Sequence, residues 1–162
     1  MARNVATLFG IGNIRPAPGT WGALVSLPLA WALHALGGPW LLLLAIVASF
    51  PIGLWAAKAE CAACGEHDPS QVVIDELCGQ WIALWPVSFG AAHVGVDVLR
   101  LWPGWVAAFV LFRLFDITKP SIIGKADRRG DTMGLMLDDV LAGLAAAIGV
   151  ILLAVLAHKV LL

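Results

Sequence analysis

The stretch that decides the fold is DDVLAGLAAAIGVILLAVL, residues 138–156. It joins two adjacent carboxylates, Asp138 and Asp139, to a long apolar run in which small residues recur from Ala142 to Gly149. Small residues let helices approach one another closely, so we expect this segment to lie centrally in a helical bundle. Adjacent carboxylates beside an apolar segment are costly unless a cation, a partner charge or water relieves them. The same stretch therefore also indicates a functional site.

The composition is typical of an integral membrane protein. Of the 162 residues, 60% are hydrophobic and 13% are charged, compared with about 45–50% and about 25% in soluble domains. This length suits one compact domain, so we assign residues 1–162 to a single integral-membrane domain. The net charge of −1 and the lack of a broad basic surface argue against a nucleic-acid partner. The expected environment is a lipid bilayer.

The chain contains five apolar segments, and we predict that each forms a helix. They lie near residues 21–36, 40–57, 77–94, 105–115 and 140–156. Several are shorter than the roughly 20 residues of a perpendicular span, and we expect Pro28, Pro51 and Pro86 to interrupt others. The predicted fold class is all-α, a compact bundle of about five to six membrane-embedded helices.

Span parity predicts which loops share a membrane face. If the N-terminus is cytoplasmic, the segments 58–76 and 113–139 also lie on the cytoplasmic side, and they carry most of the basic residues, as cytoplasmic loops usually do. The same parity places Asp75-Glu76 at the same membrane depth as Asp138-Asp139. We therefore expect one site, on the cytoplasmic face.

The two acidic pairs are candidate metal ligands. Magnesium takes one or two carboxylates and completes its shell with water and substrate phosphate. Asp75, Glu76, Asp138 and Asp139 offer such oxygens where they lead into helices. The alternative for either pair alone is a helix start whose acids complement the helix dipole. Two pairs on one face favour Mg²⁺.

Basic residues and a glycine-rich loop accompany the acids. Arg113, Asp116 and Lys119 are spaced to project from one helix face, with Pro120 ending the helix. Beside a membrane edge, this pattern favours binding of a phosphorylated head group over an exposed ion-pair ladder. Gly19-Thr20 leads into a helix whose free amides can receive an anion; the alternative is a rigid turn capped by Thr20.

Several strings together resemble one family. They are Gly10-x-Gly12 with Ala17-Pro18-Gly19-Thr20-x-Gly22, Val73-Ile74-Asp75-Glu76-x-x-Gly79, Phe112-Arg113-x-x-Asp116-x-x-Lys119-Pro120, Asp127-Arg128, and Met133-Gly134-x-Met136-x-Asp138-Asp139-x-x-Ala142-Gly143. In this order they resemble the phosphatidylglycerophosphatase A family. The resemblance implies an all-helical, magnesium-dependent phosphatase of the bacterial inner membrane. Its implied reaction converts phosphatidylglycerophosphate, a membrane phospholipid, to phosphatidylglycerol.

The site residues can now be given expected roles. Magnesium would be bound by Asp75, Glu76, Asp138 and Asp139, with Asp116 as a further ligand or the base that orients water. Arg113 and Lys119 would hold the departing phosphate. The rest of the head group would be held by Arg128 and the amides of Gly19 and Thr20.

Other phosphatase chemistries fit the residues poorly. None of the three cysteines has the arginine spacing of a cysteine phosphatase. Cys61 and Cys64 have the spacing of half a zinc site, but His67 is the only further ligand nearby, so we interpret both as buried helix residues. Attack by a metal-activated water is the remaining expectation.

Two other functions stay open at this point. The first is a small membrane transporter or scaffold whose acids form a cation path. A path needs ionisable groups at several depths, whereas the segments between the clusters are nearly free of charge. The second is a phosphatase for another lipid phosphate.

Overall fold

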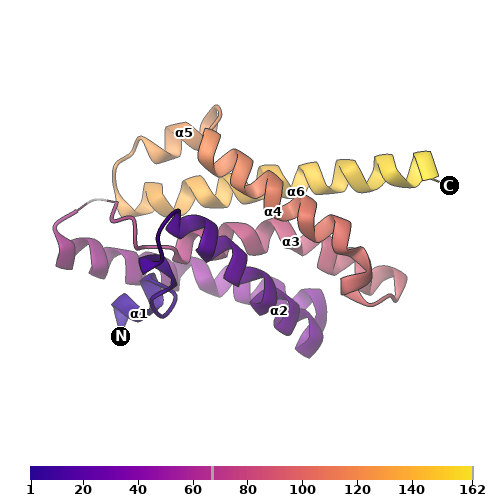
Figure 1. The fold of residues 1–162 in the computed structure, drawn as a ribbon, viewed down its shortest axis with the longest axis horizontal. Helices are drawn as coiled ribbons and strands as arrows, with labels where there is room; N and C mark the ends of the chain where they lie inside the picture. The colour runs from indigo at the N-terminus through magenta and orange to yellow at the C-terminus, as the bar shows by residue number, and fades with distance from the viewer. Residues whose placement is uncertain (67, 162) are drawn as a thin grey trace.

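The computed structural model describes residues 1–66 and 68–161, and within these ranges every regular element is a helix. The elements in order are α1 (Ala2–Ala6), η1 (Ile11–Asn13), α2 (Pro18–Cys64), α3 (Ile74–Val94), η2 (Val98–Leu101), α4 (Trp102–Thr118), α5 (Ile122–Asp127) and α6 (Thr132–Leu161). The predicted all-α fold class is confirmed. α1 and the far end of α6 lie at opposite ends of the molecule (Figure 1).

α2 is two helical arms joined at a sharp kink. The kink lies at Gly37 and Gly38, and Gly38 has a φ of 65°, a conformation that glycine adopts without strain. Gly22 and Gly53 lie equally far along the chain on either side of the kink, and both pack against the start of α3, at Val73 and Ile74 respectively. The arms therefore run antiparallel and correspond to the predicted segments 21–36 and 40–57.

The expectation that prolines interrupt the helices is wrong. α2 continues through Pro28 and Pro51, and α3 continues through Pro86. Membrane helices tolerate proline because neighbouring helices and local adjustments satisfy the freed backbone groups. α2 also extends further than predicted, so Cys61 and Cys64 are helix residues in its last turns, but they are not buried as predicted: Cys61 is half-buried and Cys64 is exposed. His67 lies outside the described residues.

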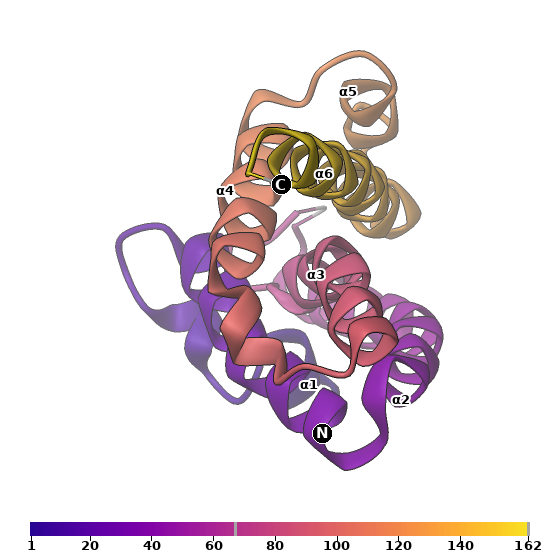
Figure 2. The ribbon, with the colours of Figure 1, turned by 90° about the vertical axis from the view of Figure 1, so that its right-hand side faces the viewer.

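α3 is the central helix and packs against α2, α4 and α6 (Figure 2). The prediction that residues 138–156 lie centrally is correct only for the first half of that stretch. Ala142 and Ala146 are fully buried, whereas residues 151–156 are exposed. α6 also begins at Thr132, so its acidic pair lies inside the helix rather than before it.

Two glycines bring α3 and α6 into backbone contact. A Cβ at Gly143 would lie only 2.4 Å from the Gly79 carbonyl oxygen, and a Cβ at Gly79 only 2.5 Å from the Asp139 carbonyl oxygen. No other residue allows this approach without displacing a helix. Gly79 follows Asp75, and Gly143 follows Asp139, by one helical turn. The glycine contact therefore sets the distance between the two acidic pairs.

The exterior of the bundle is apolar. Three helical stretches are long and apolar enough to cross a membrane: Pro18–Cys64, Val98–Thr118 and Thr132–Lys159. Large apolar side chains are exposed on all three, including Leu44, Val106 and Leu152. An apolar surface of this extent is a liability in water and is expected in lipid.

Candidate active site

A cavity of about 290 Å³ lies where the starts of α2, α3 and α6 meet the end of α4. We call it the carboxylate cavity. All of the predicted site residues line it except Thr20 and Arg128. They are Gly19, Asp75, Glu76, Arg113, Asp116, Lys119, Asp138 and Asp139.

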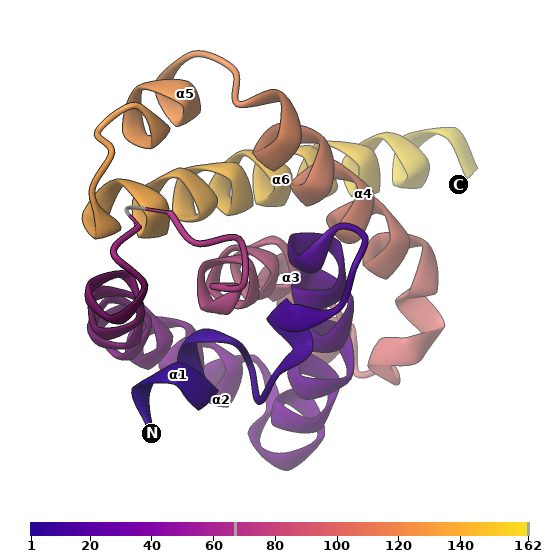
Figure 3. The same cartoon turned by 60° about the vertical axis from the view of Figure 1, so that its left-hand side comes forward.

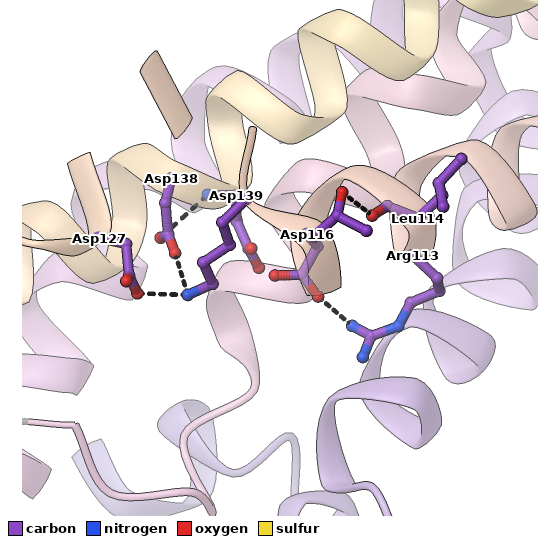
Figure 4. Close-up of polar contacts among 8 residues, drawn as sticks. Arg113, Leu114, Asp116, Asp127, Asp138 and Asp139 are labelled. Atoms are coloured by element: carbon purple, nitrogen blue, oxygen red, sulfur yellow. Dashed lines mark hydrogen bonds and ion pairs between the residues drawn. The ribbon is translucent and has the colours of Figure 1, made fainter. Parts of the chain in front are cut away.

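The structure brings the two predicted acidic pairs together. Asp75, Glu76 and Asp139 each offer an oxygen, and these oxygens lie within 4.8 Å of one another; we call them the first cluster. A second cluster is formed in the same way by one oxygen from each of three residues, Asp116, Asp138 and Asp139. Figure 4 shows the carboxylates of Asp116 and Asp139 pointing toward one another across α4 and α6. Asp139 belongs to both clusters.

Two cationic side chains pair with two of the three carboxylates of the second cluster, those of Asp116 and Asp138. The Arg113 guanidinium donates to Asp116 Oδ2 at 2.6 Å, and the Lys119 ammonium donates to Asp138 Oδ2 at 2.8 Å (Figure 4). Lys119 also donates to Asp127 on α5. Burial alone would lower the pKa of Lys119, but the hydrogen bonds to the two aspartates raise it above its usual range. Lys119 therefore carries a positive charge at neutral pH.

Lys119 does not continue the predicted face of Arg113 and Asp116. α4 ends at Thr118, and Lys119 has a φ of 44°, in the left-handed region. This turn directs the ammonium toward α5 and α6 instead of along α4. Pro120 does follow the end of the helix, as predicted.

The first cluster lacks such partners. Asp75 Oδ1, Glu76 Oε2 and Asp139 Oδ2 are buried and accept no hydrogen bond from the described residues. Buried, unpaired carboxylate oxygens cost several kcal/mol unless a cation relieves them. Hard oxygen donors gathered in this way fit magnesium, which binds carboxylates and retains open positions for water and phosphate.

Gly19 places the start of α2 directly against the cavity. A Cβ at this position would lie 2.1 Å from Glu76 Oε1 and 3.2 Å from an Arg113 guanidinium nitrogen. Thr20 differs from both of its expected roles. Its amide donates to the Ala17 carbonyl at 3.0 Å, and no side chain caps α2, because the chain turns through a left-handed Ala17 with a φ of 59°.

Arg128 is exposed at the end of α5 and does not line the cavity. α5 itself lies alongside the first turns of α6 (Figure 3). Its last residue is Asp127, which pairs with the same Lys119 ammonium as Asp138 does. The family string Asp127-Arg128 pointed to this position in the sequence. We expected Arg128 to hold the head group and gave no role to Asp127, although Asp127 is the residue that pairs with Lys119.

Asp131, Asp68 and Ser70 also line the cavity and were not predicted. Asp131 accepts from the Gly134 amide at 2.7 Å, in the first turn of α6. The hydrogen bonds from Arg129 and from that amide lower the pKa of Asp131. This hydrogen bond caps the N-terminus of α6. An aspartate just before a helix often forms such a cap, so the sequence could have identified Asp131. Ser70 accepts from Arg15 at 2.9 Å and joins two loops.

An apolar helical bundle whose cavity combines buried carboxylates with arginine and lysine has the features expected of a membrane enzyme that acts on phosphates. The comparisons with known proteins agree. Residues 4–154 match the family model described as Phosphatidylglycerophosphatase A, and the chain belongs to that family. It is accordingly a phosphatase, and the predicted resemblance is confirmed. The transporter or scaffold alternative is not supported.

Three relatives cover most of the chain. A Phosphatidylglycerophosphatase A of Haemophilus influenzae is 38% identical over 89% of this chain and 83% of its own length. A Phosphatidylglycerophosphatase A of Escherichia coli is 34% identical over 88% of this chain and 77% of its own length. A Bacteroides thetaiotaomicron protein with the provisional name phosphatidylinositol-3-phosphatase is 41% identical over 86% of this chain and 84% of its own length. No solved structure gives a significant match.

Proposed function

We propose that this chain hydrolyses phosphatidylglycerophosphate to phosphatidylglycerol and phosphate, a step of phospholipid biosynthesis, with magnesium as cofactor. The observation that carries the proposal is the carboxylate cavity, where unpaired buried acid oxygens lie beside Arg113 and Lys119. The names of two relatives support the substrate.

The carboxylates would hold the metal. Asp75, Glu76, Asp138 and Asp139 are the proposed ligands, with Asp116 adjacent to them. Bound there, magnesium would neutralise phosphate charge and lower the pKa of the attacking water. The glycine contact between α3 and α6 would keep these ligands in place.

The remaining side chains would act on the phosphate and on water. Water attacks phosphorus, the bond between phosphorus and the glycerol oxygen breaks, and the lipid leaves as an alcohol with inorganic phosphate as the second product. Asp116 would orient the attacking water, accept its proton and return a proton to the leaving glycerol oxygen. Arg113 and Lys119 would stabilise the charge on the phosphoryl oxygens. Asp127 would position Lys119 for this role.

The site would face the cytoplasm in the bacterial inner membrane. Basic residues gather at the end of the bundle that holds the cavity, among them Arg15, Lys125 and Arg129. η2, at the other end, contributes Arg100. Cytoplasmic loops carry such an excess of Lys and Arg.

A second substrate is favoured by one comparison. The Bacteroides relative is named for hydrolysis of a phosphoinositide monoester. The same cavity chemistry suits any lipid phosphomonoester, so the head group alone would distinguish the two. We keep phosphatidylglycerophosphate as the primary proposal because two of the three relatives carry that name.

The test is a panel of lipid phosphates. Purified protein would be assayed at fixed mole fraction in mixed micelles with phosphatidylglycerophosphate, phosphatidylinositol-3-phosphate, phosphatidic acid and a polyprenyl phosphate, each with and without magnesium. We expect the highest kcat/KM on phosphatidylglycerophosphate. A higher value on the phosphoinositide would transfer the proposal to that substrate, and no hydrolysis of any lipid would refute it.

A further inference from the structure

The two carboxylate clusters differ in how their charge is already balanced. In the first cluster, each of the three residues has a buried oxygen without a hydrogen-bond partner: Asp75 Oδ1, Glu76 Oε2 and Asp139 Oδ2. Asp75 and Asp139 are only 8% and 3% exposed. Water therefore reaches these carboxylates poorly, and no side chain of the described residues donates to these three oxygens, so an added cation would relieve them.

In the second cluster, the two carboxylates that are not shared with the first cluster, Asp116 and Asp138, are already paired with the protein's own cations. Both oxygens of Asp138 have partners, since Oδ2 accepts from Lys119 at 2.8 Å and Oδ1 from the Asp139 amide at 3.1 Å. Asp116 Oδ2 accepts from Arg113 at 2.6 Å. A metal ion entering here has to displace an ammonium or a guanidinium, which reduces its affinity.

We infer that the carboxylate cavity holds two divalent cations of unequal affinity that share Asp139. The first binds tightly at the first cluster. The second binds weakly at the second cluster and displaces Lys119 and Arg113 from their aspartates. Both side chains then become available to the substrate phosphate, so loading of the second position would prepare the phosphate-binding groups. The inference rests on the proposed metal dependence and adds its stoichiometry and order.

Manganese binding without substrate tests the inference. The wild-type protein in detergent would be titrated with Mn²⁺, and the free ion counted by electron paramagnetic resonance. We expect two ions per chain in two affinity classes. Ions that share one carboxylate lie about 3.5–4 Å apart in known two-metal sites, so the saturated protein should give a spin-coupled signal.

Two variants separate the two positions, and a third serves as their control. Glu76→Gln should abolish tight Mn²⁺ binding at the first cluster. Lys119→Met should tighten the weak class, on the order of tenfold, because Asp138 loses its competing cation. Lys125→Met is the matched control, since Lys125 is exposed on α5 and does not line the cavity, and it should change neither class. A misfolded protein could not bind more tightly, so the Lys119→Met result does not depend on assuming native folding.

One ion per chain at saturation, without a coupled signal, would overturn the inference. So would a Lys119→Met protein whose weak class is unchanged or weaker. The proposed function fails separately, through loss of magnesium dependence or of lipid hydrolysis. A single ion in an active, magnesium-dependent enzyme would refute only the second position, and a coupled pair in a protein inactive on every lipid phosphate would refute only the activity.

Discussion

Gly143→Ala should separate the two acidic pairs without altering any charged group. The added Cβ would lie 2.4 Å from the Gly79 carbonyl oxygen and 3.0 Å from two further Gly79 backbone atoms. Ordinary contact begins near 3.4 Å, so α3 and α6 must move apart by about 1 Å. Asp75 and Asp139 lie one turn from this contact and would separate with the helices. A displacement of that size costs on the order of 10²-fold in rate, besides about 1–3 kcal/mol of stability from overpacking.

The assay is phosphate release in mixed micelles at saturating magnesium and fixed mole fraction of lipid, with a thermal melt to show that each variant is folded. Gly90→Ala is the matched control, because Gly90 lies in α3, the helix that Gly143 contacts, but a Cβ at Gly90 would meet nothing within 4 Å. That variant should keep wild-type activity and gain up to about 1 kcal/mol of helix stability. A folded Gly143→Ala protein with activity within about threefold of wild type would refute the claim that backbone contact sets the site.

Two further predictions concern the basic residues and the topology. Lys119→Ala should lower kcat and kcat/KM together by about 10²–10³-fold, whereas Arg128→Ala, outside the cavity, should chiefly raise KM; equal, small effects would mean that the cluster only attracts anionic lipid. In a cysteine-free background, single cysteines at Glu66 and Lys125 should be labelled only from the cytoplasmic side and one at Val94 only from the other. Labelling of Glu66 and Lys125 from opposite sides would contradict the shared face.

The convergence of the acidic pairs could be predicted from the sequence. Asp75-Glu76 and Asp138-Asp139 both adjoin apolar segments, and span parity alone places them at one depth. The glycines one turn further on, Gly79 and Gly143, were visible in the family strings. Their role as the contact that fixes the spacing needed the packed helices, because which faces meet depends on helix rotation as well as on helix order.

The errors arose where a local rule met tertiary structure. Lys119 fits a helical face by spacing, but the backbone leaves the helix one residue earlier and the side chain turns to Asp138. Threonine often caps a helix with its side chain, but here Ala17 adopts a left-handed conformation and its carbonyl accepts a hydrogen bond from the Thr20 amide. α6 begins before its apolar run because Asp131 caps it with Gly134 in the first turn. Polar residues can extend a helix once it is packed. Hydropathy therefore locates the part of a helix in the membrane core more accurately than it locates the ends of that helix.

Removal and return of magnesium tests the central claim most directly. Purified protein would be treated with a chelator, assayed on phosphatidylglycerophosphate in mixed micelles, and assayed again after magnesium is restored, beside Asp75→Asn and Asp138→Asn. We predict that chelation abolishes phosphate release, that magnesium restores it, and that each variant loses several orders of magnitude in rate at any magnesium concentration. Full activity after thorough chelation, with both variants active, would contradict the account.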